Sequence, residues 1–598
     1  MKSPLKNAVA ALAASLMLLA LHSPLQAWEP VANELDATIV SGDFTAYFAH
    51  LSGWLAQKTP SDPAKITEAA MTDLLKDPIL HNALDQREFL AAHGIDKVSA
   101  FAKAEARRPF LAWVLKSATM MDMYLEAVAS TAGEIGDGSI DIGALERWHK
   151  LYAEDPESRD GVYLKLAMAS ALWPPGGGCT YRAETRDWLK RYHHYKDAHK
   201  NKELVASFDH LIVHDYGQVI SSTAADQDLA WGRKMVQTWR PDLLEKEQIH
   251  KIVSEVWRRA SPIPFDNGYV TVMEGGGKCG PRGAFGCFIC QAFGIPAITV
   301  GQPAHYCFAA RCDYPETDPQ RGSVWKVYQG RGWQVSDCGV HGSVYVAEMT
   351  KRYRTAELSL IAHLNWLAAA ISPKPPTAVA ASFPKADALR ALAVKARKPV
   401  NTSQPLAVPS DQVDVVLAGR RISPALAATM SAKEVEPDYN KESAAPVNGV
   451  SSPVAPPKVP EAPIQVPPGV IHVKIETFTA KSPDASVYDC YTGGKQVNFP
   501  KTNSDTHPQT WLDYATEAPQ AGVYALEVMV ATANRDQALD VSRGSEKLGT
   551  VRIAGTKGLW QKVGPVDIKL EKGKQILRIS APAQRGVAIR WFELTPKK

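Results

Sequence analysis

Beyond residue 27 the sequence has no apolar run long enough to cross a membrane as a helix, which takes roughly 20 consecutive apolar residues. It also has no marked excess of one charge, since 67 Lys and Arg residues against 63 Asp and Glu residues leave a net charge of +4. A charge so close to balance gives no reason to expect a nucleic-acid partner. No internal repeat is evident either. Because 598 residues are too many for one hydrophobic core, the chain is expected to form several globular domains.

The first 27 residues have the pattern of a signal peptide. Lys2 and Lys6 precede an apolar stretch at 8–21, and a small-residue cleavage site ends at Ala27. The apolar stretch of about 14 residues is too short for a membrane anchor, and no Cys lies at the cleavage point to accept a lipid. We therefore predict a signal peptide over residues 1–27 and a soluble mature protein, secreted or located in the periplasm or cell envelope.

Cysteine is scarce outside one segment, because six of the eight cysteines lie between residues 279 and 338. Disulfides are permitted outside the cytosol, but a catalytic thiol would leave an odd number for pairing, so the pairing stays open. Zinc is an alternative, with candidate ligands Cys287, Cys290, Cys307, Cys312, Cys338 and His341. The first two belong to an apolar helical pattern rather than a knuckle. We therefore expect packing or disulfides there, and no metal or cofactor.

Hydrophobic patterns divide the chain further. Helical patterns with short breakers predominate up to residue 160, and one helix is expected to start at Ser61-Asp62-Pro63 and run through Leu75. Short alternating runs separated by turn residues follow residue 470, which is typical of an all-β sandwich. The prediction is a multidomain protein with a signal peptide (1–27), a helical domain (28–160), an α+β domain (161–370), an Ala/Pro-rich linker (371–469) and a β-sandwich (470–598).

The α+β segment contains a cysteine placed for catalysis. A Gly-rich turn at 275–277 leads to Cys279, Pro281 suits the first turn of a helix, and apolar residues then recur at helical spacing until Gly294. Cys279 is therefore expected at the N-terminus of a helix, where the helix dipole and unpaired N–H groups favour a thiolate and can receive an oxyanion. His305 is expected at the start of a strand, and Asp337 after another β-like run. Their order allows a Cys-His-Asp triad.

This segment resembles the transglutaminase-like superfamily, which has a papain-like thiol fold. The resemblance covers roughly residues 160–345 and includes the Gly-rich turn into Cys279, the Gly-Ile-Pro-Ala sequence starting at Gly294, and the strand that opens with His305. Residues 243–258 resemble the long helix that precedes the catalytic loop in this superfamily. The resemblance implies an α+β, papain-like core in which Cys279 is the nucleophile, His305 the proton carrier and Asp337 the residue that orients His305.

Residues 470–598 resemble the jelly-roll-like β-sandwich of carbohydrate-binding modules of families 6 and 35. The matching pieces include the Gly493-Gly494 turn, the loop at 556–560 and the strand at 591–594. In these families two aromatic residues sandwich a sugar ring, which implies a carbohydrate-binding role for Tyr491 and Trp560. Aromatic faces stack on the apolar C–H faces of sugars. An adhesion or spacer domain is the alternative for this module.

The sequence thus favours an exported thiol-dependent enzyme that acts on amide bonds of a peptide or protein. Cys279 would attack the carbonyl, and either water or an amine would take the acyl group, so hydrolysis and acyl transfer both stay open. The C-terminal module would supply a possible glycan ligand. The alternative is a non-catalytic envelope protein that binds a glycan or glycoprotein and has an inactive transglutaminase-like domain.

Overall fold

A computed structural model describes the chain over residues 30, 32–129, 139–175, 187–244, 248–256, 268–302, 305–311, 325–328, 355–372, 383–397, 465–501, 509–581 and 585–597. The chain forms two compact units. The first consists of Met1–Tyr152 and Arg354–Lys398, and the second of Ala153–Tyr353 and Pro399–Lys598. Among the described helices, none is long and apolar enough to span a membrane.

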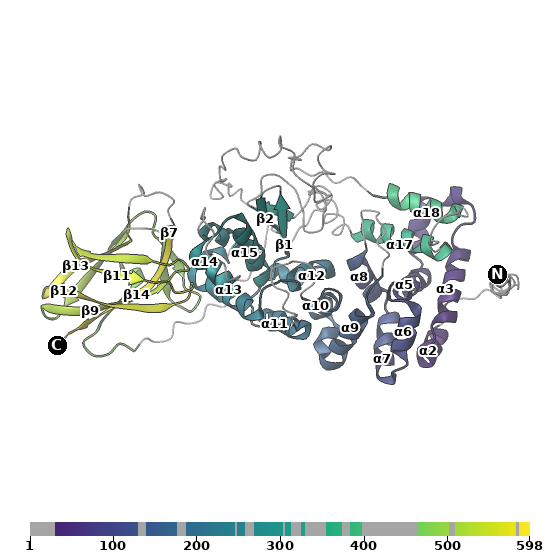
Figure 1. Ribbon diagram of the computed structural model, residues 1–598, viewed down its shortest axis with the longest axis horizontal. Helices are drawn as coiled ribbons and strands as arrows, with labels where there is room; N and C mark the ends of the chain where they lie inside the picture. Colours follow the sequence, from purple (N-terminus) through teal and green to yellow (C-terminus); the bar gives the residue numbers. More distant parts are fainter. Residues whose placement is uncertain are drawn as a thin grey trace, which may run out of the picture. The chain divides into compact units, whose positions relative to one another are not determined.

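The described part of the first unit is helical. Its elements are α2 (Ala32–Ser41), α3 (Thr45–Lys58), η1 (Pro63–Lys65), α4 (Glu68–Leu75), α5 (Pro78–His93), α6 (Ile95–Ala102), η2 (Glu105–Arg107), α7 (Arg108–Leu115), α8 (Ala118–Val128), α9 (Ile142–Glu154), α17 (Thr355–Ile371) and α18 (Pro384–Lys395). Local chemistry sets the bounds of α5: the Asp77 carboxylate accepts a hydrogen bond from the N–H of Ile79 at 2.9 Å, and Gly94 ends the helix at a φ of +84°. Helix α17, drawn in green, lies beside the purple helices α3 and α5 (Figure 1).

The second unit begins with a helical and mixed part. Its elements are η3 (Pro156–Arg159), α10 (Gly161–Leu172), α11 (Trp188–Lys200), η4 (Ala206–His210), α12 (Val213–Ile220), α13 (Asp226–Trp239), η5 (Pro241–Leu243), η6 (Ile249–Glu255), α14 (Tyr269–Gly275), α15 (Cys279–Ala292), β1 (Ala297–Gln302), β2 (His305–Arg311) and β3 (Trp325–Tyr328). The three strands form an antiparallel sheet in the order β1-β2-β3, and α15 packs on it. We call this part the thiol core.

The C-terminal part of the second unit is a sandwich of two antiparallel sheets. Its strands are β4 (Ile471–Lys474), β5 (Ala480–Lys481), β6 (Ser486–Asp489), β7 (Lys495–Lys501), β8 (Thr510–Ala518), β9 (Gly522–Ala531), β10 (Gln537–Arg543), β11 (Glu546–Ile553), β12 (Gln561–Leu570), β13 (Gly573–Ala581) and β14 (Arg585–Pro596), with the short η9 (Ile475–Thr477) after β4. One sheet has the order β11-β10-β13-β8-β5 and the other β12-β9-β14-β7-β6, with β4 also paired to β14. In β9, every second residue points into the core, as a strand of period two requires: these residues are Tyr524, Leu526, Val528 and Val530. The predicted β-sandwich is confirmed.

Several expectations are corrected. Helix α18 lies within 371–469, so the predicted linker does not hold for Pro384–Lys395, whose Leu389 and Leu392 are buried. The single helix expected from Ser61 to Leu75 is two elements, η1 and α4. Within the segment 243–258, where a long helix is expected, the structure has the 3-10 segment η6 over Ile249–Glu255, and residues 245–247 and 257–258 lie outside the described chain. The predicted signal peptide, residues 1–27, also lies outside it.

Candidate functional site

Cys279 is the first residue of α15, as the sequence predicts. The preceding turn includes Gly276 at a φ of +78°, a left-handed backbone conformation that favours glycine. Lys278 occupies the N-cap position, and its side chain makes no capping hydrogen bond. The first N–H groups of a helix have no partner within the helix, so this end of α15 offers donors and a positive dipole end beside the half-buried Cys279.

Helix α15 packs closely on strand β2 at two glycines. A Cβ atom built on Gly283 would lie 3.0 Å from the Cα atom of Cys307, and one built on Gly286 would meet the ring of Phe308. Residue numbers therefore rise in the same direction along the helix and along the strand. The close approach depends on the two glycines, because any side chain at Gly283 would press on the strand backbone.

The other two members of the predicted triad are placed differently. His305 is the first residue of β2, where its backbone is in register with Gln302 of β1. Asp337 lies outside the described residues, as do Cys312, Cys338 and His341 of the alternative zinc set. Cys287, Cys290 and Cys307 are buried within α15 and β2, in contrast to Cys279.

Buried hydrogen bonds fix the C-terminal end of α15. The Gln291 amide donates to the carbonyl oxygens of Gln218 at 2.8 Å and Ala297 at 3.0 Å, and Tyr195 donates to the Gln291 carbonyl at 2.9 Å. Arg233 of α13 donates to the Ala292 carbonyl at 3.0 Å. Tyr195 and Arg233 thus satisfy carbonyl groups at the end of the helix, which have no partner within it. The helix that begins with Cys279 is thus anchored at its far end.

A buried ion pair anchors the far end of β2. Arg311 donates to Asp215 of α12 at 2.7 Å, and both side chains are almost fully buried. A charge at such depth requires a partner, so breaking this pair would leave an uncompensated buried charge. Helix α15 and strand β2 are therefore both held at the ends away from Cys279 and His305.

Tyr491 and Trp560, the predicted carbohydrate-binding pair, lie on loops of the sandwich and are both half-buried. Burial, and then the negative charge of Glu203, raises the pKa of Tyr491. Glu203 follows α11 in the thiol core, so Tyr491 is near a charge of the core rather than surrounded by solvent alone. The Nε1 atom of Trp560 is buried and makes no hydrogen bond to the described residues.

The loop that contains Trp560 packs against helix α13. Trp231 donates from its Nε1 atom to the Lys557 carbonyl oxygen at 3.0 Å, and a Cβ atom built on Gly558 would overlap the side chain of Met235. On strand β7, Asn498 donates to the Trp239 carbonyl at 2.7 Å. We call this contact the α13 interface. The loops expected to receive a sugar thus take part in a contact within the chain.

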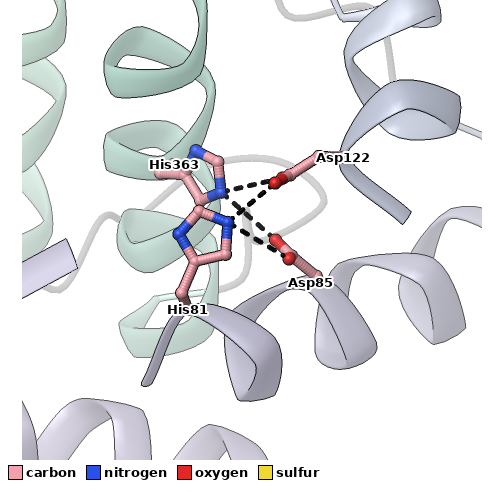
Figure 2. A group of neighbouring side chains, drawn as sticks. All are labelled: His81, Asp85, Asp122 and His363. Atoms are coloured by element: carbon pink, nitrogen blue, oxygen red, sulfur yellow. Dashed lines mark hydrogen bonds and ion pairs between the residues drawn. The ribbon is translucent and has the colours of Figure 1, made fainter. Parts of the chain in front are cut away.

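The sequence patterns gave no indication of a second cluster of titratable side chains. His81 and Asp85 of α5, Asp122 of α8 and His363 of α17 point toward one another, and we call them the His–Asp cluster (Figure 2). His81 Nε2 lies 2.8 Å from Asp122 Oδ2 and 3.4 Å from Asp85 Oδ2. His363 Nε2 lies 3.2 Å from both Asp85 Oδ1 and Asp122 Oδ1. The spacing of His81 and Asp85 by one helical turn is the only local signal, because His363 is 278 residues from Asp85.

Comparisons with known proteins bear on the sandwich. No protein-family model matches the chain, and a search of curated proteins returns no match. Among solved structures, the C-terminal β-sandwich resembles carbohydrate-binding modules. The C-terminal family 6 module of a marine laminarinase from Zobellia galactanivorans is 18% identical, with 21% of this chain and 98% of that chain covered and a TM-score of 0.18. A module from Cellvibrio mixtus lichenase 5A is 22% identical (21% and 98% covered, TM-score 0.19), and a family 35 module from Clostridium thermocellum is 16% identical (21% and 98%, TM-score 0.18).

Proposed function

We propose that the thiol core is an enzyme that acts on amide bonds through Cys279, with His305 as proton carrier and Asp337 as the residue that orients His305. The observation that supports this proposal is the register of α15 on β2. Gly283 faces Cys307, Cys279 lies four residues before Gly283, and His305 lies two residues before Cys307. Four residues of helix span about 6 Å, and two residues of strand span about 6.6 Å. The two steps are nearly equal and run in the same direction, which favours a Cys279 that lies beside His305.

The chemistry follows from these positions. The Cys279 thiol transfers its proton to the His305 imidazole, and the thiolate attacks the carbonyl carbon of the amide. The oxyanion that forms can accept hydrogen bonds from backbone N–H groups in the first turn of α15. His305 then gives the proton to the leaving amine, and water or a second amine releases the acyl group from Cys279. Hydrolysis and acyl transfer differ only in this last step.

The glycan part of the function remains a prediction from the sequence motif of Tyr491 and Trp560. We propose that any glycan ligand binds where these two aromatic residues meet solvent at the edge of the α13 interface. The contact leaves both side chains partly exposed rather than fully covered. A glycan-binding protein with an inactive thiol core is the alternative, and the thiol titration below distinguishes the two.

The test is the alkylation rate of Cys279 measured against pH by peptide mapping. In the wild-type chain we expect Cys279 to react before every other cysteine, also at mildly acidic pH, where an ordinary thiol is mostly protonated. His305→Ala should abolish turnover and move the thiol titration to higher pH, because an adjacent imidazolium stabilises the thiolate. Asp337→Asn should abolish turnover with a smaller change in the titration.

His193→Ala is the matched control, because it removes an exposed imidazole from α11 and should leave the titration of Cys279 unchanged. If His305→Ala also leaves it unchanged, the two side chains do not interact and the enzyme hypothesis fails in favour of the binding one. If Cys287 or Cys290 is labelled first, the choice of nucleophile is wrong.

A further inference from the structure

We propose that the His–Asp cluster is a structural site for one divalent cation of the zinc type, which fastens α17 to α5 and α8. The site is separate from the thiol chemistry, because its residues all belong to the first compact unit. Two imidazole nitrogens and two carboxylates from three helices converge on one point (Figure 2). Histidine nitrogen and carboxylate oxygen are ligands of zinc in proteins.

Hydrogen bonds from the Nδ1 atoms to backbone carbonyl oxygens fix the orientation of both imidazole rings. His363 Nδ1 lies 2.6 Å from the Ser359 carbonyl oxygen, and His81 Nδ1 lies 3.3 Å from the Leu75 carbonyl oxygen. A carbonyl oxygen can only accept, so each Nδ1 atom carries a proton and the lone pair of a neutral ring is at Nε2. Metal-binding histidines typically have this outer hydrogen bond to a carbonyl, which selects the nitrogen that faces the metal.

The carboxylate oxygens and Nε2 atoms that face one another in the cluster require positive charge between them. A neutral Nε2 lone pair that faces a carboxylate oxygen is repelled by it, and Asp85 Oδ2 and Asp122 Oδ1 are buried without a hydrogen bond of good geometry. Protonation of both rings would also balance the two carboxylates, but it would place two positive charges in rings whose centroids are only 4.5 Å apart. One divalent cation neutralises both carboxylates and leaves both imidazoles neutral. The charge of the cluster therefore balances with a single metal ion.

The separations suit one coordination shell. Ligand atoms about 2.0–2.1 Å from one zinc ion are about 3.3 Å apart at the corners of a tetrahedron. The nitrogen–oxygen separations in the cluster are 2.8, 3.2, 3.2 and 3.4 Å, with a different oxygen of each carboxylate facing each imidazole. All four ligand atoms lie within 4.8 Å of one another, so the widest pair must shorten when an ion binds.

Burial indicates a structural rather than a catalytic role. The side chains of Asp85 and His363 are 0% and 1% exposed, while those of Asp122 and His81 are 22% and 24% exposed. The protein itself supplies four ligands, which is typical of a closed structural zinc site. The partly exposed side provides a path for the ion to enter.

The experiment uses the full chain, freed of metal with a chelator and titrated with Zn²⁺ by calorimetry. The wild-type chain should bind one ion more than His363→Ala and than His81→Gln, so cysteine-bound zinc cancels in the comparison. A hundredfold excess of Zn²⁺ over Kd should raise the melting temperature of the first unit by about 5–10 °C in the wild-type chain. Neither variant should show this rise.

His50→Ala is the matched control, because it breaks the exposed His50–Glu34 ion pair of the same unit without touching the cluster. It should keep both the extra ion and the shift in melting temperature. His81→Gln replaces a partly exposed side chain, so it keeps the test valid if His363→Ala fails to fold. Equal zinc stoichiometry in the wild-type chain and His81→Gln would overturn the proposal, as would a wild-type melting temperature that Zn²⁺ leaves unchanged.

Discussion

At the scale of single residues, Arg233 of the thiol core joins three neighbouring segments. Besides the Ala292 carbonyl, it donates to Glu203 at 2.8 Å and to His194 Nε2 at 3.1 Å. Arginine can only donate, so His194 must accept through an unprotonated Nε2 atom. Burial, and then the positive charge of Arg233, lowers the pKa of His194 to about 4. Neutral His194 is therefore part of the native hydrogen-bonding pattern.

This dependence predicts a loss of stability in acid. In the unfolded chain His194 binds a proton at its ordinary pKa of 6.5, whereas the folded chain resists protonation down to about pH 4. Between these values the unfolded chain binds more protons, so the free energy of unfolding falls as pH falls, by up to about 3 kcal/mol. His194→Gln keeps an acceptor that does not titrate and should flatten this part of the profile. Urea unfolding at pH 7, 5.5 and 4.5 measures the slope.

The neighbouring His193→Gln is the control, because that side chain is exposed on the same helix and should keep the wild-type slope. A slope that is equally steep in His194→Gln would mean that other groups cause the loss of stability in acid.

The residues that the sequence located best are those whose role is local. The Gly-rich turn, Pro281 and Gly294 predicted a helix from about Cys279, and the structure has α15 from Cys279 to Ala292 with Gly294 at a φ of +79°. Each signal acts within a few residues of the boundary that it determines. His363 gave no such signal, because its partners are brought to it only by tertiary packing. A lone histidine in an apolar helix is indistinguishable from a core residue in sequence.

At the scale of elements, competition between neighbouring caps explains a wrong prediction. Asp62 caps only the short η1, because Thr67 caps a new helix: its hydroxyl accepts from the N–H of Ala70 at 3.3 Å. The expected continuous helix is therefore divided at Ile66. Helix α18 was missed for a different reason, since the surrounding Ala- and Pro-rich composition was interpreted as unpacked. Alanine, leucine and lysine are also strong helix formers, and burial of one face decides the outcome.

Because of the α13 interface, alanine substitutions at two glycines of the sandwich should differ in their effect on stability. Gly558 has a φ of +72° and its added Cβ atom would overlap Met235, while Gly544 has a φ of +59° and has open space around it. Both alanine variants pay a similar backbone cost of roughly 1 kcal/mol, but Gly558→Ala must also separate the loop from α13. We expect Gly558→Ala to be less stable than Gly544→Ala by about 1–3 kcal/mol. Thermal melting of the full chain compares the two.

Equal melting temperatures for the two glycine variants would contradict the packing of this loop on α13. An increase in exposure of Trp560, measured by its fluorescence quenching in Gly558→Ala but not in Gly544→Ala, would support the packing independently.

At the scale of the whole molecule, the Pro-rich composition of residues 400–469 predicts preferential cleavage there by an added protease, because such a segment buries little apolar surface. Denaturing gels should show a fragment that corresponds to residues 470–598. Because Trp231, Asn498 and Arg535 all make hydrogen bonds across the boundary between thiol core and sandwich, the fragment should co-elute with the core in native size-exclusion chromatography. A chain that resists cleavage in this segment would show that the prediction is wrong.

The assignment of segments to compact units was harder to predict than the segments themselves. Periodicity identified helices at the start and strands at the end, since both patterns are local. It gave no means to assign Arg354–Lys398 to the same compact unit as Met1–Tyr152. That assignment depends on which surfaces of α17 meet α3, α5 and α8, which is a property of packed side chains.

The return of α17 to the first unit also has a kinetic consequence. A ribosome that has made residues 1–352 has produced every described helix of the first unit except α17 and α18, yet His363, the fourth member of the His–Asp cluster, is still missing. Helices α3 and α5 also lack the packing surface that α17 supplies, so the early helices are expected to stay loosely associated until α17 emerges. Closing so distant a contact is slow in comparison with local helix formation. Completion of the first unit is thereby timed to follow synthesis of the thiol core.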